Sequence, residues 1–392
     1  MSPKNTTNKL RVRKGRSVVH KNLEDNYGAV VIANHEALAQ VLEQVQQSAA
    51  MQPSLRGLKA CTNLRWSDFS IQQNKTYTKA GKRFFYPALW KSNQGQVNVT
   101  LMLYKEQMVS QMVCQSVQPT TLSLNAITEF CDLVPLQQFG EEGEDLVQAT
   151  IVVLAHANVD TIQSYGEDLH SETAKDNQPT DQIHEAIFMM LQLINGLKCL
   201  QARGVEEIPE SLTSFIVLRE VQPTHGSTMN LPSPDDRLSS LSAPKTNCYG
   251  RLCILQGLTD DMNCSKSTDE DLSSLCKCAT KATEILLPRD KLTPLIKEIL
   301  HEERAVSLNQ AKSVLEFMLW APFDVVQGVP AEERELSLQR WLDLERATVL
   351  HGLVRTRVQL NVFEQLHLMF LVRSTAKAMC DASVLLEKAN VI

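Results

Sequence analysis

The sequence predicts an α+β protein with two lobes, a small β-rich lobe followed by a larger helical lobe. Between about residues 68 and 105, β-branched and aromatic segments alternate with the turn sequences KAGK and KSNQGQ. An apolar helical pattern then covers residues 181–201, and the chain after about residue 269 has helical periodicity throughout. A chain of 392 residues is long enough for one such domain with additional helices at its ends.

The composition is that of a globular protein and excludes some functions. Hydrophobic residues make up 43% of the chain and charged residues 21%. The net charge of −6 argues against a nucleic-acid-binding protein that relies on a broad positive field. No apolar run has the length of a transmembrane segment. The ten cysteines show neither a disulfide framework nor zinc-finger spacing, so we expect no metal ion and a reducing, cytoplasmic environment.

Two segments have the composition of disordered chain. Residues 1–25 contain seven Lys and Arg residues and no acid before Glu24, which predicts a disordered basic arm. We expect this arm to be a solvated tail rather than a contact for anionic membranes. Residues 222–247 are rich in Pro and Ser, and they are predicted to form a disordered insertion between two strands.

A helix is expected within residues 26–52, ahead of the β-rich region. Asn34 can cap its first turn, and Leu38, Val41 and Leu42 fall on one face at helical spacing. No other helix follows nearby in the sequence. The apolar face therefore needs a partner that lies far along the chain.

The segment INGLKCLQARGVEEIPESLTSFIVL, which begins at Ile194, has the frame in which protein kinases enter their catalytic loop. Gly204 and the apolar strand at 215–218 both fit this frame. With the order of the lobes, the frame predicts a two-lobed protein-kinase-like fold at residues 60–328. Its N-lobe would cover about residues 60–165 and its C-lobe about residues 166–328.

The residues that perform phosphoryl transfer in kinases are missing from this frame. Pro209 stands at the position of the catalytic Asp and Ser214 at that of the metal-binding Asn. Gln256 replaces the Asp of the D-F-G motif, and the first hairpin offers only Gly81 in place of a Gly-rich loop. We therefore expect a pseudokinase without catalytic residues, bound cofactor or metal ion.

The third strand of the sheet should carry an inward-pointing Lys that contacts the phosphates of the nucleotide. In VNVTLMLYK the central inward candidates are Leu101 and Leu103, and Lys105 follows only at the end of the strand. Because a Lys at the end of a strand is usually a surface residue, we expect Lys105 to lie at the surface.

Several segments resemble the PEAK/pragmin family of pseudokinase scaffolds. They include YGAVVIANHEALAQVLEQ from Tyr27, MLQLINGLKCLQARG from Met190 and LQRWLDLERATVLHGL from Leu338. In that family, helices before and after the pseudokinase domain pack together as a split dimerisation module. The resemblance assigns residues 331–390 to this module. It gives these candidate interface residues: Leu38, Val41, Leu42, Trp341, Leu342 and Leu344.

The resemblance implies a dimerising signalling scaffold in the pathways of the actin cytoskeleton and cell migration. The partner would be a second copy or a related pseudokinase, and signalling adaptors or tyrosine kinases are further candidate partners. The expected location is the cytoplasm, with the cytoskeleton or adhesions as candidate sites of association. Apolar residues occur nearly all round the helices between residues 336 and 372, which is consistent with helices covered on two faces.

Two other functions remain open. A monomeric allosteric partner of an active kinase would use the same C-terminal helices to bind that kinase. A residual phosphotransferase would need Glu206, Glu207 or Glu210 as a displaced general base. Three acids around a proline are, however, more typical of a solvated turn.

Overall fold

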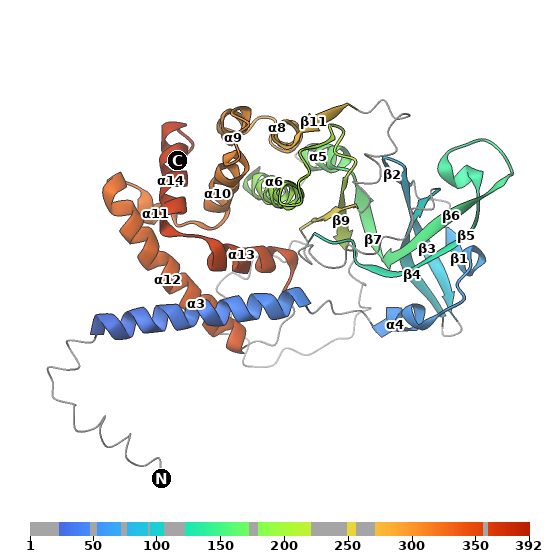
Figure 1. Cartoon of the computed structure of the whole chain (residues 1–392), viewed down its shortest axis with the longest axis horizontal. Helices are drawn as coiled ribbons and strands as arrows, with labels where there is room; N and C mark the ends of the chain where they lie inside the picture. Colours follow the sequence, from blue (N-terminus) through green and yellow to red (C-terminus); the bar gives the residue numbers. More distant parts are fainter. Residues whose placement is uncertain are drawn as a thin grey trace, which may run out of the picture. The chain divides into compact units, whose positions relative to one another are not determined.

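The computed structural model describes residues 23–47, 53–71, 77–92, 95–105, 122–171, 179–220, 249–255, 271–355 and 360–392. The chain divides into two compact units (Figure 1). The helical unit comprises residues 1–48 and 322–383, and the two-lobed unit comprises residues 49–321 and 384–392. Most of the predicted arm, the predicted insertion at 222–247 and Gln256 lie outside the described residues.

The helical unit joins the two ends of the chain. Its helices are α3 (Leu23–Gln47), α11 (Phe323–Val326), α12 (Ala331–Arg355), α13 (Val362–Arg373) and most of α14 (Ala376–Lys388). The N-terminal helix α3 packs on both α12 and α13. The partner that the apolar face of α3 requires is therefore supplied by the C-terminal end of the same chain.

Helix α3 differs from the prediction at its start. It begins at Leu23, so Asn34 lies inside the helix and does not cap it. The prediction was wrong because the run YGAVVIA before Asn34 is apolar on every side. Such a run shows no helical stripe, and the expected helix was therefore started only where a stripe appears.

The N-lobe is an antiparallel sheet in the order β1-β3-β4-β6-β5, with β2 paired to β3. Its strands are β1 (Phe69–Ile71), β2 (Thr78–Ala80), β3 (Arg83–Ser92), β4 (Gly95–Tyr104), β5 (Ala126–Pro135) and β6 (Leu146–Ala155). The turn predicted at KAGK joins β2 to β3, and Gly81 adopts φ +57° there. Helix α4 (Pro53–Ala60) contributes Leu55 and Leu58 to the core on one face of this sheet.

The C-lobe is mainly helical. Its helices are α5 (Ile162–Ser171), α6 (Pro179–Gln201), α8 (Leu275–Leu286), α9 (Leu292–His301) and α10 (Ser307–Trp320). Two small sheets complete it, with strands β7 (Ala157–Asp160), β9 (Phe215–Glu220) and β10 (Arg251–Ile254) in one and β8 (Glu207–Pro209) and β11 (Leu272–Ser274) in the other. Strand β11 interrupts the helical region that was predicted after residue 269.

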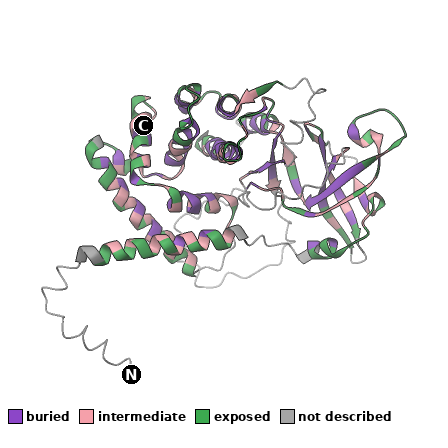
Figure 2. Ribbon diagram, viewed as in Figure 1, coloured by how far each residue is buried: buried purple, intermediate pink, exposed green. Residues whose placement is uncertain are grey.

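Helix α6 is the central helix of the C-lobe. It packs against α8, α10 and β10, and most of its residues are buried (Figure 2). By length and hydropathy its segment Thr180–Gln201 could also cross a membrane. However, 67% of the most apolar 18-residue stretch in this segment is buried inside the fold. Gln192 of α6 is 1% exposed and hydrogen-bonds both Gly250 O and Leu252 N at 2.9 Å. A polar side chain buried in this way fixes the start of β10 against the helix.

Candidate functional site

The catalytic-loop positions are occupied by residues that support the fold. Pro209 ends β8 and pairs with Leu272 of β11. Ser214 is 4% exposed, and its carbonyl accepts a hydrogen bond of 2.9 Å from the backbone N–H of Leu255. Pro209 has no group that could accept a proton from a substrate. The third predicted position, Gln256, lies outside the described residues.

The three acids near Pro209, which are Glu206, Glu207 and Glu210, do not point together into the space between the two lobes. Lys281 Nζ lies 3.3 Å from Glu210 Oε1, and Ser273 Oγ donates to Glu210 Oε2 at 3.3 Å. Glu206 and Glu207 are exposed. Glu210 is thus part of an ion pair on the surface of the C-lobe, which is the role expected for an acid in a solvated turn.

Strand β4 has the opposite register to the one predicted. Leu101 and Leu103 belong to the core that includes Leu58 of α4, on the far side of the sheet from the C-lobe. Met102 lies on the side that faces the C-lobe strands. The prediction was one residue out because both faces of β4 are apolar, so alternation of polar and apolar residues could not identify the faces.

Lys105 lies at the surface, as expected. Its ammonium group forms an ion pair with Glu141 and lies 5.2 Å from the centre of the Phe139 ring. Phe139 belongs to the same core as Leu103, which places Lys105 beside the face of the sheet turned away from the C-lobe. Lys105 therefore does not stand where a kinase lysine contacts phosphates.

An apolar core fills the space between the two lobes. In one cluster, residues of β3, β4 and β6 pack directly against residues of β9 and β10, which belong to the C-lobe. Its largest members are Phe85, Met102, Val152, Leu154, Ile216, Leu218 and Leu255. Gly81 approaches the C-lobe as well, since a Cβ at this turn would lie 3.6 Å from Thr213 Cβ. A nucleotide between the lobes would have to displace these side chains.

The linker between the lobes, β7, has its backbone groups bonded by side chains of the N-lobe. Thr100 Oγ1 donates to Ala157 O at 3.0 Å and accepts from Ala157 N at 3.1 Å. Thr78 Oγ1 donates to Val159 O at 2.7 Å. Backbone groups of this linker are the natural partners for a ligand held between the lobes. Here the chain satisfies those groups itself.

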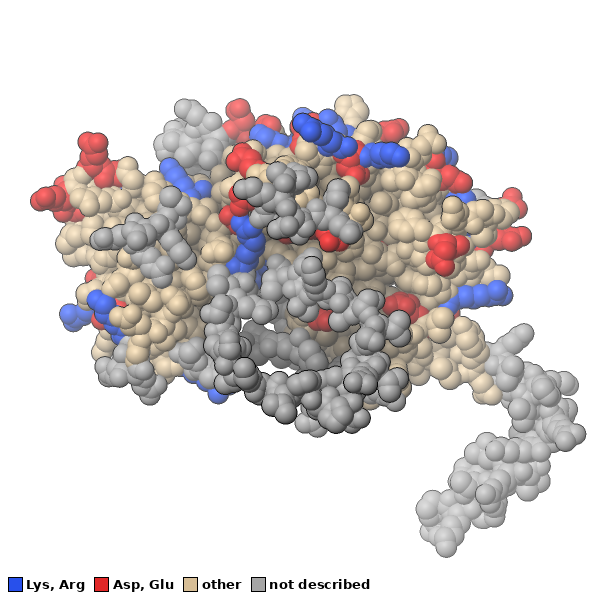
Figure 3. All heavy atoms as spheres, turned by 180° about the vertical axis from the view of Figure 1, so that it is seen from behind, with Lys and Arg blue, Asp and Glu red and all other residues tan. Residues whose placement is uncertain are grey.

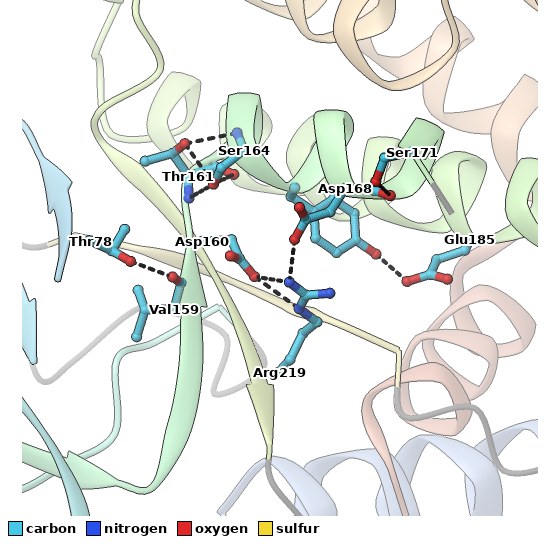
Figure 4. A network of polar contacts seen from close by, with 10 residues as sticks. Thr78, Val159, Asp160, Thr161, Ser164, Asp168, Ser171, Glu185 and Arg219 are labelled. Carbon is cyan, nitrogen blue, oxygen red and sulfur yellow. Dashed lines mark hydrogen bonds and ion pairs between the residues drawn. The ribbon is translucent and has the colours of Figure 1, made fainter. Parts of the chain in front are cut away.

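A charged network fixes the other side of the linker (Figure 4). Arg219 of β9 lies 2.7 Å from Asp160 and 2.8 Å from Asp168, and its guanidinium lies 5.7 Å from the centre of the Tyr165 ring. The Tyr165 hydroxyl donates to Glu185 at 2.5 Å. Burial raises the pKa of Asp160, and the neighbouring Arg219 opposes that shift. The linker is thereby tied to α5, α6 and β9.

A hollow of about 590 Å³ lies elsewhere in the C-lobe, beside α8 and α9. Charges of both signs line it, and they pair with each other, as in Lys297 with Glu284 at 2.5 Å and Lys277 with Glu303 at 3.8 Å. Acidic and basic side chains are also interspersed on the face of the molecule in Figure 3. Because positive and negative groups are mixed and paired, neither the hollow nor this face favours an anionic ligand over a cationic one.

Within the helical unit, polar side chains from α3 and α12 meet at the C-terminal end of α13. Arg346 donates from Nε to Leu371 O at 2.8 Å and from Nη2 to Ser374 O at 3.0 Å. His35 Nε2 donates to Val372 O at 2.8 Å. The last carbonyls of a helix have no partner within it, so these three bonds satisfy groups that would otherwise be unpaired. His35 and Arg346 belong to the two segments that resemble the PEAK/pragmin family most specifically.

The candidate interface residues occupy different positions in this unit. Leu38, Leu42 and Leu342 are 0%, 6% and 1% exposed, so they form the core of the helical unit within a single chain. Val41 and Trp341 are half-buried. A buried core residue cannot itself touch a partner, and helical spacing alone does not separate core residues from interface residues.

Leu344 differs from the other candidates because it is 67% exposed. Other large apolar side chains of the helical unit are exposed as well. Six large apolar side chains of α3 and α12 are each more than half exposed: Tyr27, Val30, Ile32, Leu336, Leu344 and Val354. The three on α3 were not among the predicted residues. The signal for them was the run GAVVIA, which continues the helix with apolar residues outside its buried stripe.

Comparison with solved structures identifies the fold. The structure of the pseudokinase PEAK1 (Sugen Kinase 269) matches with a TM-score of 0.58 and 16% sequence identity, over 91% of this chain and 99% of that one. The PAN3 pseudokinase and C-terminal region from Neurospora crassa, in complex with PAN2, matches with a TM-score of 0.31 and 12% identity, over 81% and 73% of the two chains, which is too weak to support an argument. No protein-family model and no curated sequence match the chain. The chain has the fold of a PEAK-like pseudokinase.

Proposed function

We propose that this protein is a catalytically inactive pseudokinase scaffold that dimerises through its helical unit. The filled space between the lobes supports the first half of the proposal. Apolar side chains and the Thr100 hydroxyl take up the volume and the linker groups that a nucleotide would need. Lys105 and Pro209 add no group that could assist phosphoryl transfer there.

The observation that carries the dimerisation proposal is the exposed apolar surface of the helical unit. Leu344 and Val354 of α12 are 67% and 78% exposed, and Tyr27 and Val30 of α3 are each 57% exposed. Exposed apolar side chains on a folded protein are candidates for a site of association. A second copy of the chain carries the same surface and can cover it.

Helix α3 carries two adjacent stripes at three- and four-residue spacing, and they differ in how deeply they are buried within the chain. The inner stripe contains the buried and half-buried residues Val31, His35, Leu38, Leu42 and Val45. The outer stripe contains Tyr27, Val30, Asn34, Ala37 and Val41. A helix with two apolar stripes needs cover on two faces. The exposed start of the outer stripe, at Tyr27 and Val30, is thus the part of α3 that remains for a partner.

The cellular role of the scaffold follows from the family resemblance. We assign the protein to cytoplasmic signalling that controls the actin cytoskeleton and cell migration. A related pseudokinase is the alternative partner in a heterodimer, and the dimer would present signalling adaptors or tyrosine kinases to one another. The interspersed surface charges agree with protein partners rather than nucleic acid.

The test is the solution mass of the whole chain, measured by light scattering over a dilution series around the micromolar range. Leu344→Asp places a charge on the exposed apolar surface and should yield a folded monomer where the wild type is a dimer. Leu146→Asp is the matched control, since Leu146 is also an exposed leucine, at 58%, but belongs to the two-lobed unit. Circular dichroism shows whether each variant keeps its helices.

The outcomes separate the proposed dimer from its rivals. A monomeric wild type at the highest concentration contradicts homodimerisation and favours a heterodimer or the allosteric partner of an active kinase. A dimer that survives Leu344→Asp contradicts the surface assigned here. Magnesium-dependent nucleotide binding would support the residual phosphotransferase, whereas an unchanged melting temperature on addition of nucleotide would count against it.

A further inference from the structure

Of the six tyrosines in the chain, Tyr27 has the most exposed side chain, at 57%. Four of the others have a hydrogen-bonded hydroxyl: Tyr86 with Gln138 O at 2.6 Å, Tyr104 with Glu129 at 3.1 Å, Tyr165 with Glu185 at 2.5 Å and Tyr249 with His184 at 3.4 Å. The fifth, Tyr77, is 45% exposed, and its ring packs on Phe84 and Tyr86. Among the described residues, none hydrogen-bonds the Tyr27 hydroxyl.

The helix around Tyr27 also lacks buried residues that would anchor it to the rest of the unit. None of residues 26–33 is buried, whereas Leu38 and Leu42 further along α3 are. A helical segment of this length with no buried residue is only marginally stable in water. The first turns of α3 can therefore open locally while the rest of the helix stays packed on α12 and α13. Opening gives an enzyme access to the tyrosine in an extended backbone.

Tyr27 also lies on the surface assigned to the partner. It shares the outer stripe of α3 with Val30 and Val41. A phosphate on the ring would bring close to two negative charges into this apolar stripe, and burying them against a second copy would require their desolvation. Glu24 and Asp25 precede Tyr27 in the sequence, so the phosphate would be added to a locally acidic stretch of chain.

We infer that Tyr27 is a phosphorylation site for a tyrosine kinase and that its phosphorylation dissociates the dimer. The phenolic oxygen of Tyr27 attacks the γ-phosphorus of ATP in the active site of that kinase. The bond from the γ-phosphorus to the bridging oxygen breaks, ADP leaves, and the phenolic proton passes to the catalytic base of the kinase. The monomer is the substrate, because the dimer covers Tyr27. This inference rests on the proposed dimer.

The experiment treats the full chain with a soluble tyrosine kinase and Mg-ATP. Mass spectrometry maps the phosphate, and light scattering over a dilution series gives the dimer dissociation constant before and after treatment. We expect phosphate on Tyr27 and a dissociation constant raised at least about tenfold, since the interface would have to desolvate the phosphate. Tyr27→Phe keeps the ring, so this variant should dimerise like the wild type and be insensitive to the kinase.

Tyr77→Phe is the matched control, because Tyr77 is the other exposed tyrosine but belongs to the two-lobed unit. This variant should respond to the kinase as the wild type does. A chain that stays unphosphorylated at Tyr27, or a phosphorylated chain with an unchanged dissociation constant, overturns the inference and leaves the dimer intact. A wild type that is monomeric before treatment overturns the proposed dimer, and the inference with it.

Discussion

The two units of this protein differ in where their apolar side chains lie. In the two-lobed unit, Phe85, Met102 and Ile216 are turned into the space between the lobes, where a kinase would hold a ligand. In the helical unit, Leu344 and Val354 are left on the outside. Within the described residues the helical unit exposes as many large apolar side chains as the two-lobed unit, although the two-lobed unit is the longer one.

Under the proposed function, this difference places the binding role in the helical unit rather than between the lobes. A cleft filled by its own side chains gains stability from burial and loses the volume that ligand binding requires. An exposed apolar surface costs solubility and is retained where a partner covers it. The proposed function therefore assigns no chemistry to the two-lobed unit and a binding role to the helical unit.

The largest effect should come from the core of the helical unit. Leu342→Ala removes a side chain that is 1% exposed and should lower the free energy of unfolding of this unit by about 2–5 kcal/mol. Hydrogen exchange of α3, α12 and α13 measures the change. Leu344→Ala, two residues away but 67% exposed, should change stability by less than about 0.5 kcal/mol. Equal effects of the two variants would contradict the distinction between core and surface on α12.

The helical unit should also be the more sensitive to acid. Burial lowers the pKa of His367 to about 4. In the unfolded chain this histidine binds a proton below about pH 6.5, whereas in the folded unit the ring stays neutral until about pH 4. Stability is therefore fully present above pH 6.5 and is lost as the pH falls toward 4, by about 2 kcal/mol at pH 5.

Unfolding of the helical unit at pH 7 and pH 5, followed by hydrogen exchange, measures this loss. His367→Phe replaces the ring, which lies 6.2 Å from the Phe370 ring, with one that does not titrate. In this variant the free energy of unfolding of the helical unit should differ much less between pH 7 and pH 5 than in the wild type. The same difference in the wild type and the variant would show that other groups cause the acid sensitivity.

The bonds that close the linker should have a somewhat smaller effect, confined to the two-lobed unit. Thr100→Val keeps the shape of the side chain but leaves Ala157 N–H and Ala157 C=O without their partner. We expect a loss of about 1–2 kcal/mol, because buried backbone groups would be unsatisfied. Thr100→Ser retains the hydroxyl and should behave more like the wild type. Thermal unfolding gives the size of the loss, and faster amide exchange at Ala157 would locate it.

The smallest effect should come from Lys105. Its ion pair with Glu141 is at the surface, so Lys105→Ala should cost less than about 1 kcal/mol. Addition of Mg-ATP should leave the melting temperatures of the wild type and the variant unchanged, because Lys105 does not face the space between the two lobes. A nucleotide-dependent shift that the variant abolishes would show that the cleft opens in solution.

The sequence contained enough information to predict the order of the lobes and much of their detail. The turn at Gly81, the helix near residues 181–201 and the strand at residues 215–218 were all expected, because each has a strong local signal. Strand β5, by contrast, was not predicted. Its segment AITEFCDLVP mixes Glu129, Cys131 and Asp132 with apolar residues, and it is a strand because it pairs with β6.

The candidate site was harder to predict because it depends on contacts between distant residues. The absence of acidic residues at Pro209 and Ser214 was visible in the sequence, but the filling of the cleft by Met102 was not, because β4 is apolar on both faces. Likewise, periodicity marked Leu38 and Leu342 as apolar contacts without showing that they contact their own chain. The bond from His35 to Val372 joins residues that no local pattern relates.

The construction of the helical unit from both ends of the chain has a consequence for biosynthesis. Helix α3 ends at Gln47 and leaves the ribosome well before α12, on which it packs and which begins at Ala331. At about 5–20 residues per second, α3 waits roughly 15–60 seconds for its partner. During that time both of its apolar stripes are uncovered and available to chaperones or to neighbouring nascent chains. Assembly of the helical unit therefore has to wait until α12 has been synthesised, and a chain truncated before α12 would leave the α3 stripes uncovered.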